Sequence, residues 1–231
     1  MTRAVLPPPP ERAVPLVRTT WVTKLLSGEH KCEWALWFLW RHDVPPEPLT
    51  PEGRERIERH DAFVNDRAAE LREYGWNVQV EWENLRDYVG KQTGTILSGK
   101  ADLTINEADK ITFEECKTGH WRWRADHIQV LLYAQIEKWR HVNKPMVGTV
   151  LYQENPSDPV DVEKVEMDER LPIRDAYVAL MGRVASEALR PVPDPRECKY
   201  CKARPYCAER ADDNEAMPFG WDEPFDDRRQ H

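Results

Sequence analysis

Two acidic side chains and a lysine are the residues of this sequence whose types and spacing best fit a chemical reaction. Asp102 lies within the apolar stretch 95–105, and Glu115 and Lys117 lie two positions apart at the end of the stretch 111–117. Two carboxylates held close together repel unless a cation lies between them, and their oxygens suit Mg²⁺ or Mn²⁺. A lysine beside such an ion can orient or deprotonate a water molecule and stabilise charge on a phosphate. These residues therefore predict metal-assisted hydrolysis of a phosphodiester bond.

Three more polar residues lie on helical patterns that direct them toward the same region. His60 recurs with apolar residues at spacings of three and four in the segment 51–75, so we expect it to face inward as a candidate third metal ligand. Gln129 and Tyr133 are four positions apart on the next helix and share a face. They are candidates to hold the lysine or to contact a DNA backbone. The alternative interpretation is a surface ion pair at a sheet edge, with a structural histidine in the core.

The cysteines form a second pattern that indicates a metal site. Cys198, Cys201 and Cys207 are crowded near the C-terminus, and thiolates so close in sequence favour zinc or an iron–sulfur cluster. The fourth ligand is either Cys32, far away in the sequence, or a histidine if the metal is zinc. Cys116 lies between Glu115 and Lys117, so alternation along a strand turns it to the opposite face, where we expect a buried apolar role.

A short stretch before the Gln129 helix alternates aromatic and basic residues. Its members are Trp121, Arg122, Trp123 and Arg124. Aromatic rings stack on bases and arginines neutralise phosphates, a combination that suits single-stranded nucleic acid. The stretch is therefore a candidate DNA-binding segment, the alternative being tryptophans packed on the sheet with exposed arginines.

The composition indicates a folded protein without a blanket of positive charge. The chain has 231 residues, of which 40% are hydrophobic and 32% are charged, enough for a substantial core. Its 33 basic and 41 acidic residues give a net charge of −8, which excludes histone-like binding but not a local basic groove. No stretch reaches the ~20 apolar residues of a membrane-spanning helix, and no signal-peptide pattern is present. We expect a soluble, cytoplasmic protein that does not bind membranes.

The periodicity of apolar residues predicts an α/β fold. The expected elements are, in order, helices at 32–40 and 51–75, a strand at 78–82, a hairpin of 95–105 with 111–117, a helix at 123–140, strands at 147–152 and 160–165, and a helix at 173–189. Helices before and after a group of strands predict a central mixed β-sheet flanked by helices. We expect one domain at 19–207, a proline-rich extension at 1–18 and a mobile acidic tail at 208–231.

The order of the polar residues along the chain resembles the RecB-like branch of the PD-(D/E)XK nucleases over residues 20–207. The motifs concerned are His60, Asp102, Glu115-x-Lys117 and Gln129-x-x-x-Tyr133. The resemblance implies a restriction-endonuclease-like core. The catalytic residues that it implies are Asp102, Glu115, Lys117, Gln129 and Tyr133, and the ligands to Mg²⁺ or Mn²⁺ are His60, Asp102 and Glu115. One departure is the distance between Gly53 and His60, which is longer than in the family.

The distribution of the cysteines resembles the iron–sulfur subgroup of these nucleases, which includes the exonucleases of CRISPR adaptation. This resemblance implies a [4Fe–4S] cluster that joins the N-terminal and C-terminal segments in a structural role. Its ligands are Cys32, Cys198, Cys201 and Cys207.

The same resemblance implies an antiviral function. The expected activity is that of a metal-dependent DNA exonuclease, which digests single-stranded or frayed DNA ends from 5′ to 3′ during CRISPR spacer acquisition. DNA with single strands or overhangs and a CRISPR integrase complex are then the expected partners. Two alternatives remain open. One is a phage-borne or DNA-repair nuclease of the same fold without a CRISPR role, and the other is a non-catalytic iron–sulfur module that binds DNA ends or a partner.

Overall fold

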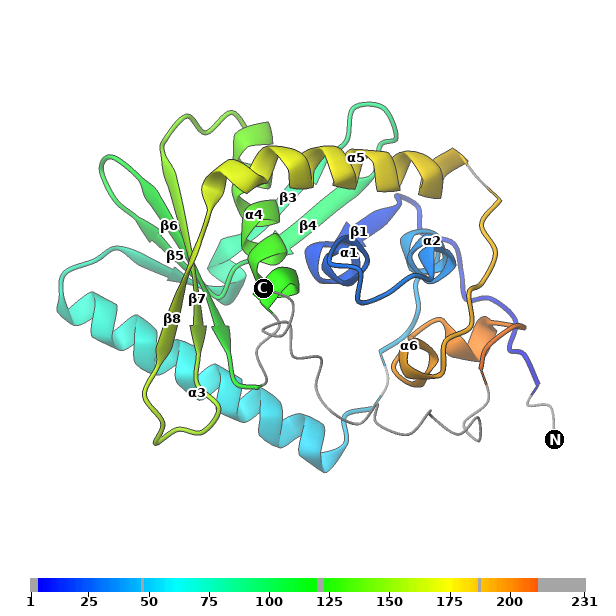
Figure 1. The fold of residues 1–231 in the computed structure, drawn as a ribbon, viewed down its shortest axis with the longest axis horizontal. Helices are drawn as coiled ribbons and strands as arrows, with labels where there is room; N and C mark the ends of the chain where they lie inside the picture. The colour runs from blue at the N-terminus through cyan, green and yellow to red at the C-terminus, as the bar shows by residue number, and fades with distance from the viewer. Residues whose placement is uncertain (1–3, 47, 120–122, 187, 212–231) are drawn as a thin grey trace, which may run out of the picture.

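The computed structural model describes residues 4–46, 48–119, 123–186 and 188–211. Eight strands in this part of the chain form two sheets (Figure 1). The five-stranded sheet has the order β2-β5-β6-β7-β8, and the three-stranded sheet has the order β1-β4-β3. Strands β6 and β7 run parallel, as do β1 and β4, while the other neighbours are antiparallel. Both sheets are therefore mixed.

The strands and helices match most of the expected ranges, with β1, α1, β3 and α6 in addition. The strands are β1 (Leu16–Arg18), β2 (Val78–Val80), β3 (Leu85–Val89), β4 (Ile96–Lys100), β5 (Leu103–Asn106), β6 (Ile111–Lys117), β7 (Met146–Tyr152) and β8 (Asp161–Val165). The α-helices are α1 (Thr19–Leu26), α2 (Glu33–Arg41), α3 (Pro51–Glu73), α4 (Trp123–Trp139), α5 (Arg170–Ser186) and α6 (Pro195–Lys199). Short 3₁₀ turns are η1 (Glu81–Asn84), η2 (Met167–Glu169) and η3 (Arg204–Tyr206).

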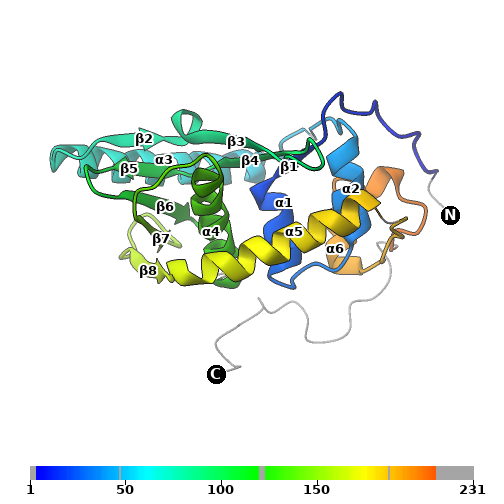
Figure 2. The same cartoon turned by 90° about the horizontal axis from the view of Figure 1, so that it is seen from above.

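Helices cover both faces of the five-stranded sheet (Figures 1 and 2). On one face, α3 packs Val64 and Ala68 against Leu103 and Leu151 of the strands. On the other face, α4 packs against the opposite side of β6 and β7, and a further apolar cluster joins α4 to α1, α2 and α5. The predicted α/β architecture, with mixed β-structure between helices, is thus confirmed.

The hairpin predicted for 95–105 with 111–117 is only partly correct. The first stretch is two strands, because the chain leaves β4 at Lys100 and enters β5 at Leu103. Lys100 pairs with Leu85 in the three-stranded sheet, whereas Leu103 pairs with Glu114 in the five-stranded sheet. Asp102 therefore lies at the junction between the two sheets rather than inside a continuous strand.

The strand predicted at 78–82 is shorter than expected. It ends at Val80, and Glu81 begins the turn η1 with a positive φ of 42°, a conformation that is strained for a residue with a side chain. The backbone N–H of Glu81 donates to the carbonyl of Asp102 at 2.9 Å. The polar segment that follows forms β3, which sequence periodicity did not predict.

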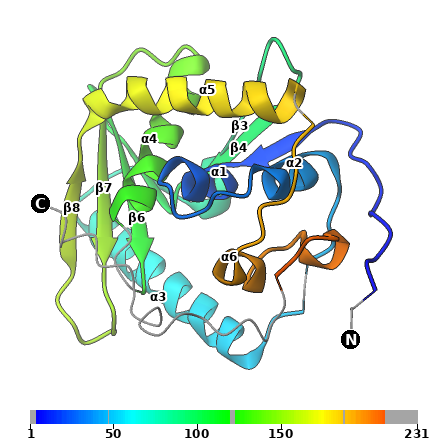
Figure 3. The same ribbon diagram turned by 45° about the vertical axis from the view of Figure 1, so that its right-hand side comes forward.

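The two ends of the described chain lie against each other (Figure 3). Phe38 of α2 stacks on Tyr206, with ring centroids 5.1 Å apart. The buried carboxylate of Glu197 in α6 accepts backbone hydrogen bonds from Lys31 at 2.8 Å and Cys32 at 3.2 Å. The segment expected to be an extension contributes β1, where Val17 is fully buried, so the folded unit begins before residue 19. Most of the expected acidic tail, 212–231, lies outside the described residues.

Within the described residues, the structure contains no helix that is both long enough and apolar enough to span a membrane.

Two glycines provide a test of how tightly α4 packs on the sheet. A Cβ at Gly148 of β7 would lie 2.5 Å from Cγ1 of Val130, and would also contact Met167. A Cβ at Gly182 of α5 would meet nothing within 4 Å. We expect Gly148→Ala to lower the free energy of unfolding by about 1–3 kcal/mol. The same change at Gly182 should raise it by up to about 1 kcal/mol, because alanine favours helix. Urea unfolding measures both, and equal effects would contradict the packing.

Candidate active site

Strand β6 presents its polar side chains to the two helical layers in alternation. Glu115 and Lys117 face α4, while Cys116 is fully buried on the side of α3. The adjacent Glu114 also faces α3, where Arg67 donates to its two oxygens at 2.8 and 2.9 Å. The predicted division of faces is confirmed. Burial raises the pKa of the Cys116 thiol, which fits the predicted apolar role.

Lys117 lies among three side chains that accept or balance its charge. Its Nζ atom donates to Glu115 Oε1 at 2.6 Å and to Gln129 Oε1 at 3.3 Å. It also lies 3.7 Å from Asp126 Oδ1. Burial by itself lowers the pKa of Lys117, but the carboxylates of Glu115 and Asp126 more than offset this effect and raise the pKa. The lysine is therefore a cation at neutral pH.

Gln129 links the lysine, the glutamate and the tyrosine. Its Nε2 atom donates to Glu115 Oε1 at 2.6 Å and to the Tyr133 hydroxyl oxygen at 2.5 Å. Tyr133 is buried, and burial raises its pKa well above the ordinary value. A Cβ at Gly99 of β4 would come within 2.9 Å of Tyr133 Cδ1, so glycine is required there for α4 to approach the sheet. The predicted face of Gln129 and Tyr133 thus points into the site.

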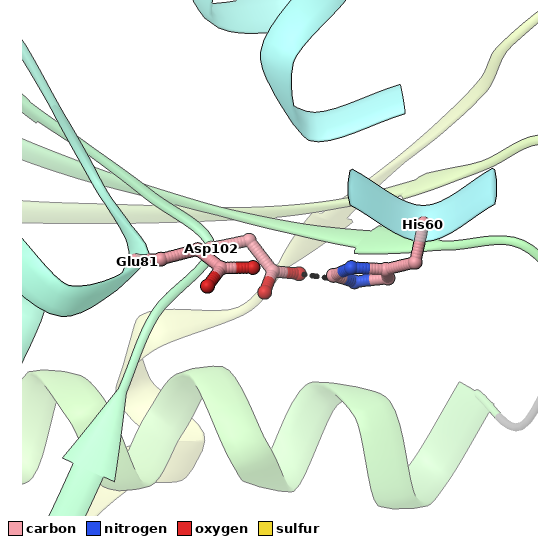
Figure 4. A group of neighbouring side chains, drawn as sticks. All are labelled: His60, Glu81 and Asp102. Carbon is pink, nitrogen blue, oxygen red and sulfur yellow. Dashed lines mark ion pairs between the residues drawn. The ribbon is translucent and has the colours of Figure 1, made fainter. Parts of the chain in front are cut away.

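Asp102 reaches the same region from the junction between the sheets. Its Oδ2 atom accepts a hydrogen bond from the backbone N–H of Cys116 at 2.8 Å. The same oxygen lies 3.3 Å from His60 Nε2 on α3, an ion pair drawn in Figure 4. The hydrogen bond to Asp102 raises the pKa of His60 to about 9, against the opposing effect of burial. His60 and Asp102 are therefore in direct contact, as a shared metal site requires.

Glu81 joins this pair, which sequence reasoning did not predict. Ligand atoms of His60, Glu81 and Asp102 all lie within 4.8 Å of one another (Figure 4). Glu81 Oε2 also accepts a hydrogen bond from Lys100 Nζ at 2.8 Å. The sequence placed Glu81 inside a strand, whereas in the structure it begins the turn η1 with a positive φ. The signal that could have found it is an acid at the end of an apolar strand.

Glu115 is not part of this group, but one of its oxygens is left without a partner. Oε1 accepts hydrogen bonds from Lys117 and Gln129. Oε2 is buried and has no hydrogen-bond partner within the described residues. Burial raises the pKa of Glu115 to about 7, and the charge of Asp102 adds to this effect. A buried carboxylate oxygen without a partner is costly, and a cation would satisfy it.

Most of these residues, though not Glu115 or Tyr133, line a cavity of about 720 Å³. Its wall includes His60, Glu81, Asp102, Lys117 and Gln129. Asp126, which sequence reasoning also missed, lies in the same wall and accepts a hydrogen bond from the Tyr152 hydroxyl at 3.0 Å. Asp126 lies one turn before Gln129 on α4, a spacing that could have indicated it.

The aromatic–basic stretch is only partly described. Trp121 and Arg122 lie outside the described residues. Trp123 is the first residue of α4, and Arg124 is exposed in its first turn. The DNA-binding prediction for this segment therefore remains a prediction.

Four cysteines line a separate cavity of about 280 Å³ near the C-terminal segment. They are Cys32, Cys198, Cys201 and Cys207, and His30 lines the same cavity. Among the described residues, no three of these sulfur atoms lie within 4.8 Å of one another. Helix α1 separates this cavity from the carboxylate site, since Thr20 and Lys24 line both. The four cysteines named in the sequence analysis therefore line one space, and their role as ligands stays a prediction.

The chain matches one family of known proteins over most of its length. The profile of the PD-(D/E)XK nuclease superfamily matches residues 10–208. The chain therefore belongs to the PD-(D/E)XK nuclease superfamily, which confirms the prediction of a nuclease, an enzyme that hydrolyses phosphodiester bonds. The search of curated proteins found no match. Among solved structures, the chain is similar to "Crystal structure of SSO0001", with 16% identity, a TM-score of 0.45 and coverage of 85% of this chain and 87% of that one.

The pKa of His60 makes metal binding depend on pH. A metal ion can bind His60 only after the imidazole ring has lost the proton that the contact with Asp102 stabilises. The affinity of the site for the metal therefore rises with pH until the His60 pKa of about 9 is passed. Between pH 7.5 and 9, above the pKa of about 7 for Glu115, we expect the apparent affinity for Mg²⁺ to increase by up to about tenfold per unit. Isothermal titration calorimetry measures it. His60→Gln should bind more weakly with a flatter profile, and an unchanged slope would exclude His60 as a ligand.

Proposed function

We propose that this chain is a metal-dependent DNA exonuclease that acts on single-stranded or frayed DNA ends. The observation that carries the proposal is the convergence of His60, Glu81 and Asp102 beside a second buried group, Glu115 with Lys117. A cluster of buried carboxylates with one imidazole nitrogen is a donor set that suits Mg²⁺ or Mn²⁺. The unpartnered oxygen of Glu115 supports the same interpretation.

His60, Glu81 and Asp102 are the residues that would hold the metal, and Glu115 Oε2 is a buried oxygen nearby without a hydrogen-bond partner in the described residues. When bound, Mg²⁺ or Mn²⁺ polarises a phosphate and lowers the pKa of a water molecule. The strained backbone of Glu81 supports a functional role, because such strain is concentrated at sites where a side chain must point in one direction.

The remaining polar residues of the site orient one another and balance the charge of Lys117. Lys117 stays charged in the metal-free protein, so we assign to it a hydrogen bond to the attacking water or to a phosphate oxygen rather than the role of base. Gln129 fixes the lysine and Glu115 through its amide. The Tyr133 hydroxyl accepts a hydrogen bond from the same amide, and the Asp126 carboxylate is a second negative charge near Lys117.

The nuclease proposal is tested by two substitutions, Asp102→Asn, which leaves the shape of the site nearly unchanged, and Lys117→Ala, which removes the ammonium group with its side chain. We expect Asp102→Asn and Lys117→Ala each to lower cleavage of end-labelled single-stranded DNA by at least about 10³-fold, because the first weakens the proposed metal site and the second removes the cation assigned to the attacking water or a phosphate oxygen. Activity should also vanish with a chelator and return with Mg²⁺ or Mn²⁺.

Asp175→Asn and Lys164→Ala, at exposed positions of α5 and β8, are the matched controls and should retain full activity. Wild-type activity in the two site variants would contradict the assignment. DNA binding without cleavage under any metal would favour the alternative of a non-catalytic module that binds DNA ends or a partner.

We also propose that Cys32, Cys198, Cys201 and Cys207 bind a [4Fe–4S] cluster. A tetrahedral zinc site with bonds of ~2.3 Å needs its sulfurs within about 3.8 Å of one another. The position of four thiols around one cavity supports a group held by four thiolates. Such a group would tie the N-terminal and C-terminal segments together, as Glu197 already does. His30 in the same cavity keeps zinc as the alternative.

The cluster proposal predicts a brown protein. Anaerobically purified chain should contain about four irons per molecule and absorb visible light. Cys32→Ala and Cys201→Ala should lose iron and colour, while Cys116→Ala, which removes a thiol on the buried side of β6, should retain both. A colourless protein loaded with zinc would exclude the cluster.

The polarity of digestion and the pathway rest on resemblance to the iron–sulfur nucleases of CRISPR adaptation. On that basis we propose 5′ to 3′ digestion in spacer acquisition, with a CRISPR integrase complex as partner. A phage-borne or repair nuclease of the same fold remains the second candidate. Strands labelled at either end distinguish the polarity, and co-purification with an integrase tests the partner.

A further inference from the structure

A basic hollow lies beside the cysteine-bearing segment. Its volume is about 850 Å³, and the described residues that line it include no aspartate or glutamate. Five of the lining residues are basic: Arg56, Lys199, Lys202, Arg204 and Arg210. In a chain with a net charge of −8, such a concentration of one sign produces a local positive potential. The hollow is therefore suited to a polyanion.

Tyr200 stands in the wall of this basic hollow with most of its surface in solvent. Its exposed fraction is 73%. Lys199 Nζ lies 5.3 Å from the centre of its ring. An exposed ring with a cation beside it is the combination used to hold the bases and phosphates of a single strand.

Arg56 connects the basic hollow to the catalytic cavity. It lines both spaces. It lies four residues before His60 on α3, so the two side chains share a face of the helix. Within the described residues no ion pair is formed by Arg56 or by Lys202, which leaves both charges available to an anion. Arg56 therefore offers a cationic contact for a phosphate between the hollow and the cavity of the metal ligands.

Trp82 provides a second exposed ring at the catalytic end of this path. Its exposed fraction is 74%, and it lines the same cavity as Asp102. Lys100 Nζ lies 4.6 Å from the centre of its ring. The positive φ of Glu81 turns the chain immediately before it. The same turn thus directs a carboxylate to Asp102 and presents a flat apolar surface beside it.

We propose that an unpaired DNA strand runs from the basic hollow across Arg56 into the catalytic cavity, with bases stacked on Tyr200 and Trp82. This inference rests on the proposed function and adds the path of the strand and the residues that hold it. The faces of bases are accessible in a single strand, whereas in a duplex they are covered by their neighbours. Exposed rings at both ends of the path therefore favour unpaired DNA. A blunt duplex can interact with the basic residues but cannot stack its bases on the rings.

Binding in the presence of a chelator tests the path without requiring cleavage. The probes are a fluorescent single-stranded oligonucleotide and a blunt duplex of the same sequence. We expect Trp82→Ala and Tyr200→Ala each to weaken binding of the single strand roughly tenfold, with little change for the duplex. Tyr74→Ala, which removes an equally exposed ring at the end of α3 (74% exposed), is the matched control and should bind as the wild type does.

The basic residues give a separate readout. Lys199→Ala combined with Lys202→Ala should reduce the slope of log affinity against log salt by about 1.4 for a single strand, since each phosphate contact contributes about 0.7. Lys164→Ala on β8 is the control. A strand whose bases are replaced by abasic sites should bind the wild type and Trp82→Ala equally well, because nothing remains to stack.

The results separate this inference from the nuclease proposal. If Trp82→Ala and Tyr200→Ala bind the single strand as the controls do, or lose the duplex to the same extent, the path is overturned even if the wild type cleaves DNA. If the wild type does not cleave but these variants selectively lose the single strand, the path stands and the nuclease proposal fails.

Discussion

The burial of two negative charges beside each other is the constraint on which the rest of the structure depends. Asp102 and Glu115 are 5% and 3% exposed, and removing a carboxylate from water costs several kcal/mol unless it is compensated. Compensation comes from three elements at once. Strand β6 supplies a backbone N–H and Lys117, helix α3 supplies His60, and helix α4 supplies Gln129. The site exists only when all three are packed correctly, so its geometry and the tertiary fold are specified by the same contacts.

Strand β6 carries charged networks on both of its faces. On one face Glu115 and Lys117 belong to the candidate active site. On the other face Glu114 forms a bidentate ion pair with Arg67. A single register slip would exchange these faces and bury unmatched charges. The ion pair between Arg67 and Glu114 therefore favours the correct register of strand β6, in addition to its contribution to stability.

The parts of the fold and site that depend on local periodicity were predictable from the sequence. The opposite faces of Glu115 and Cys116 follow from alternation, and the shared face of Gln129 and Tyr133 follows from the helical repeat. Glu81 was missed, because periodicity does not encode the turn with a positive φ that begins at this residue. The transfer of the chain from one sheet to the other at Asp102 was missed for a related reason, since both strands are apolar and only tertiary pairing separates them.

Helix α1 forms a common wall between the thiol-lined space and the carboxylate site, through Thr20 and Lys24. Two sites that share a helix but no ligand are thermodynamically linked whenever occupation of one site changes the conformational freedom of that helix. Linkage of this kind is reciprocal, so each centre alters the affinity of the other by the same factor. If the thiol-lined space holds the proposed group, loss of that group would change the affinity of the carboxylate site for its metal, even though the group takes no part in the chemical step.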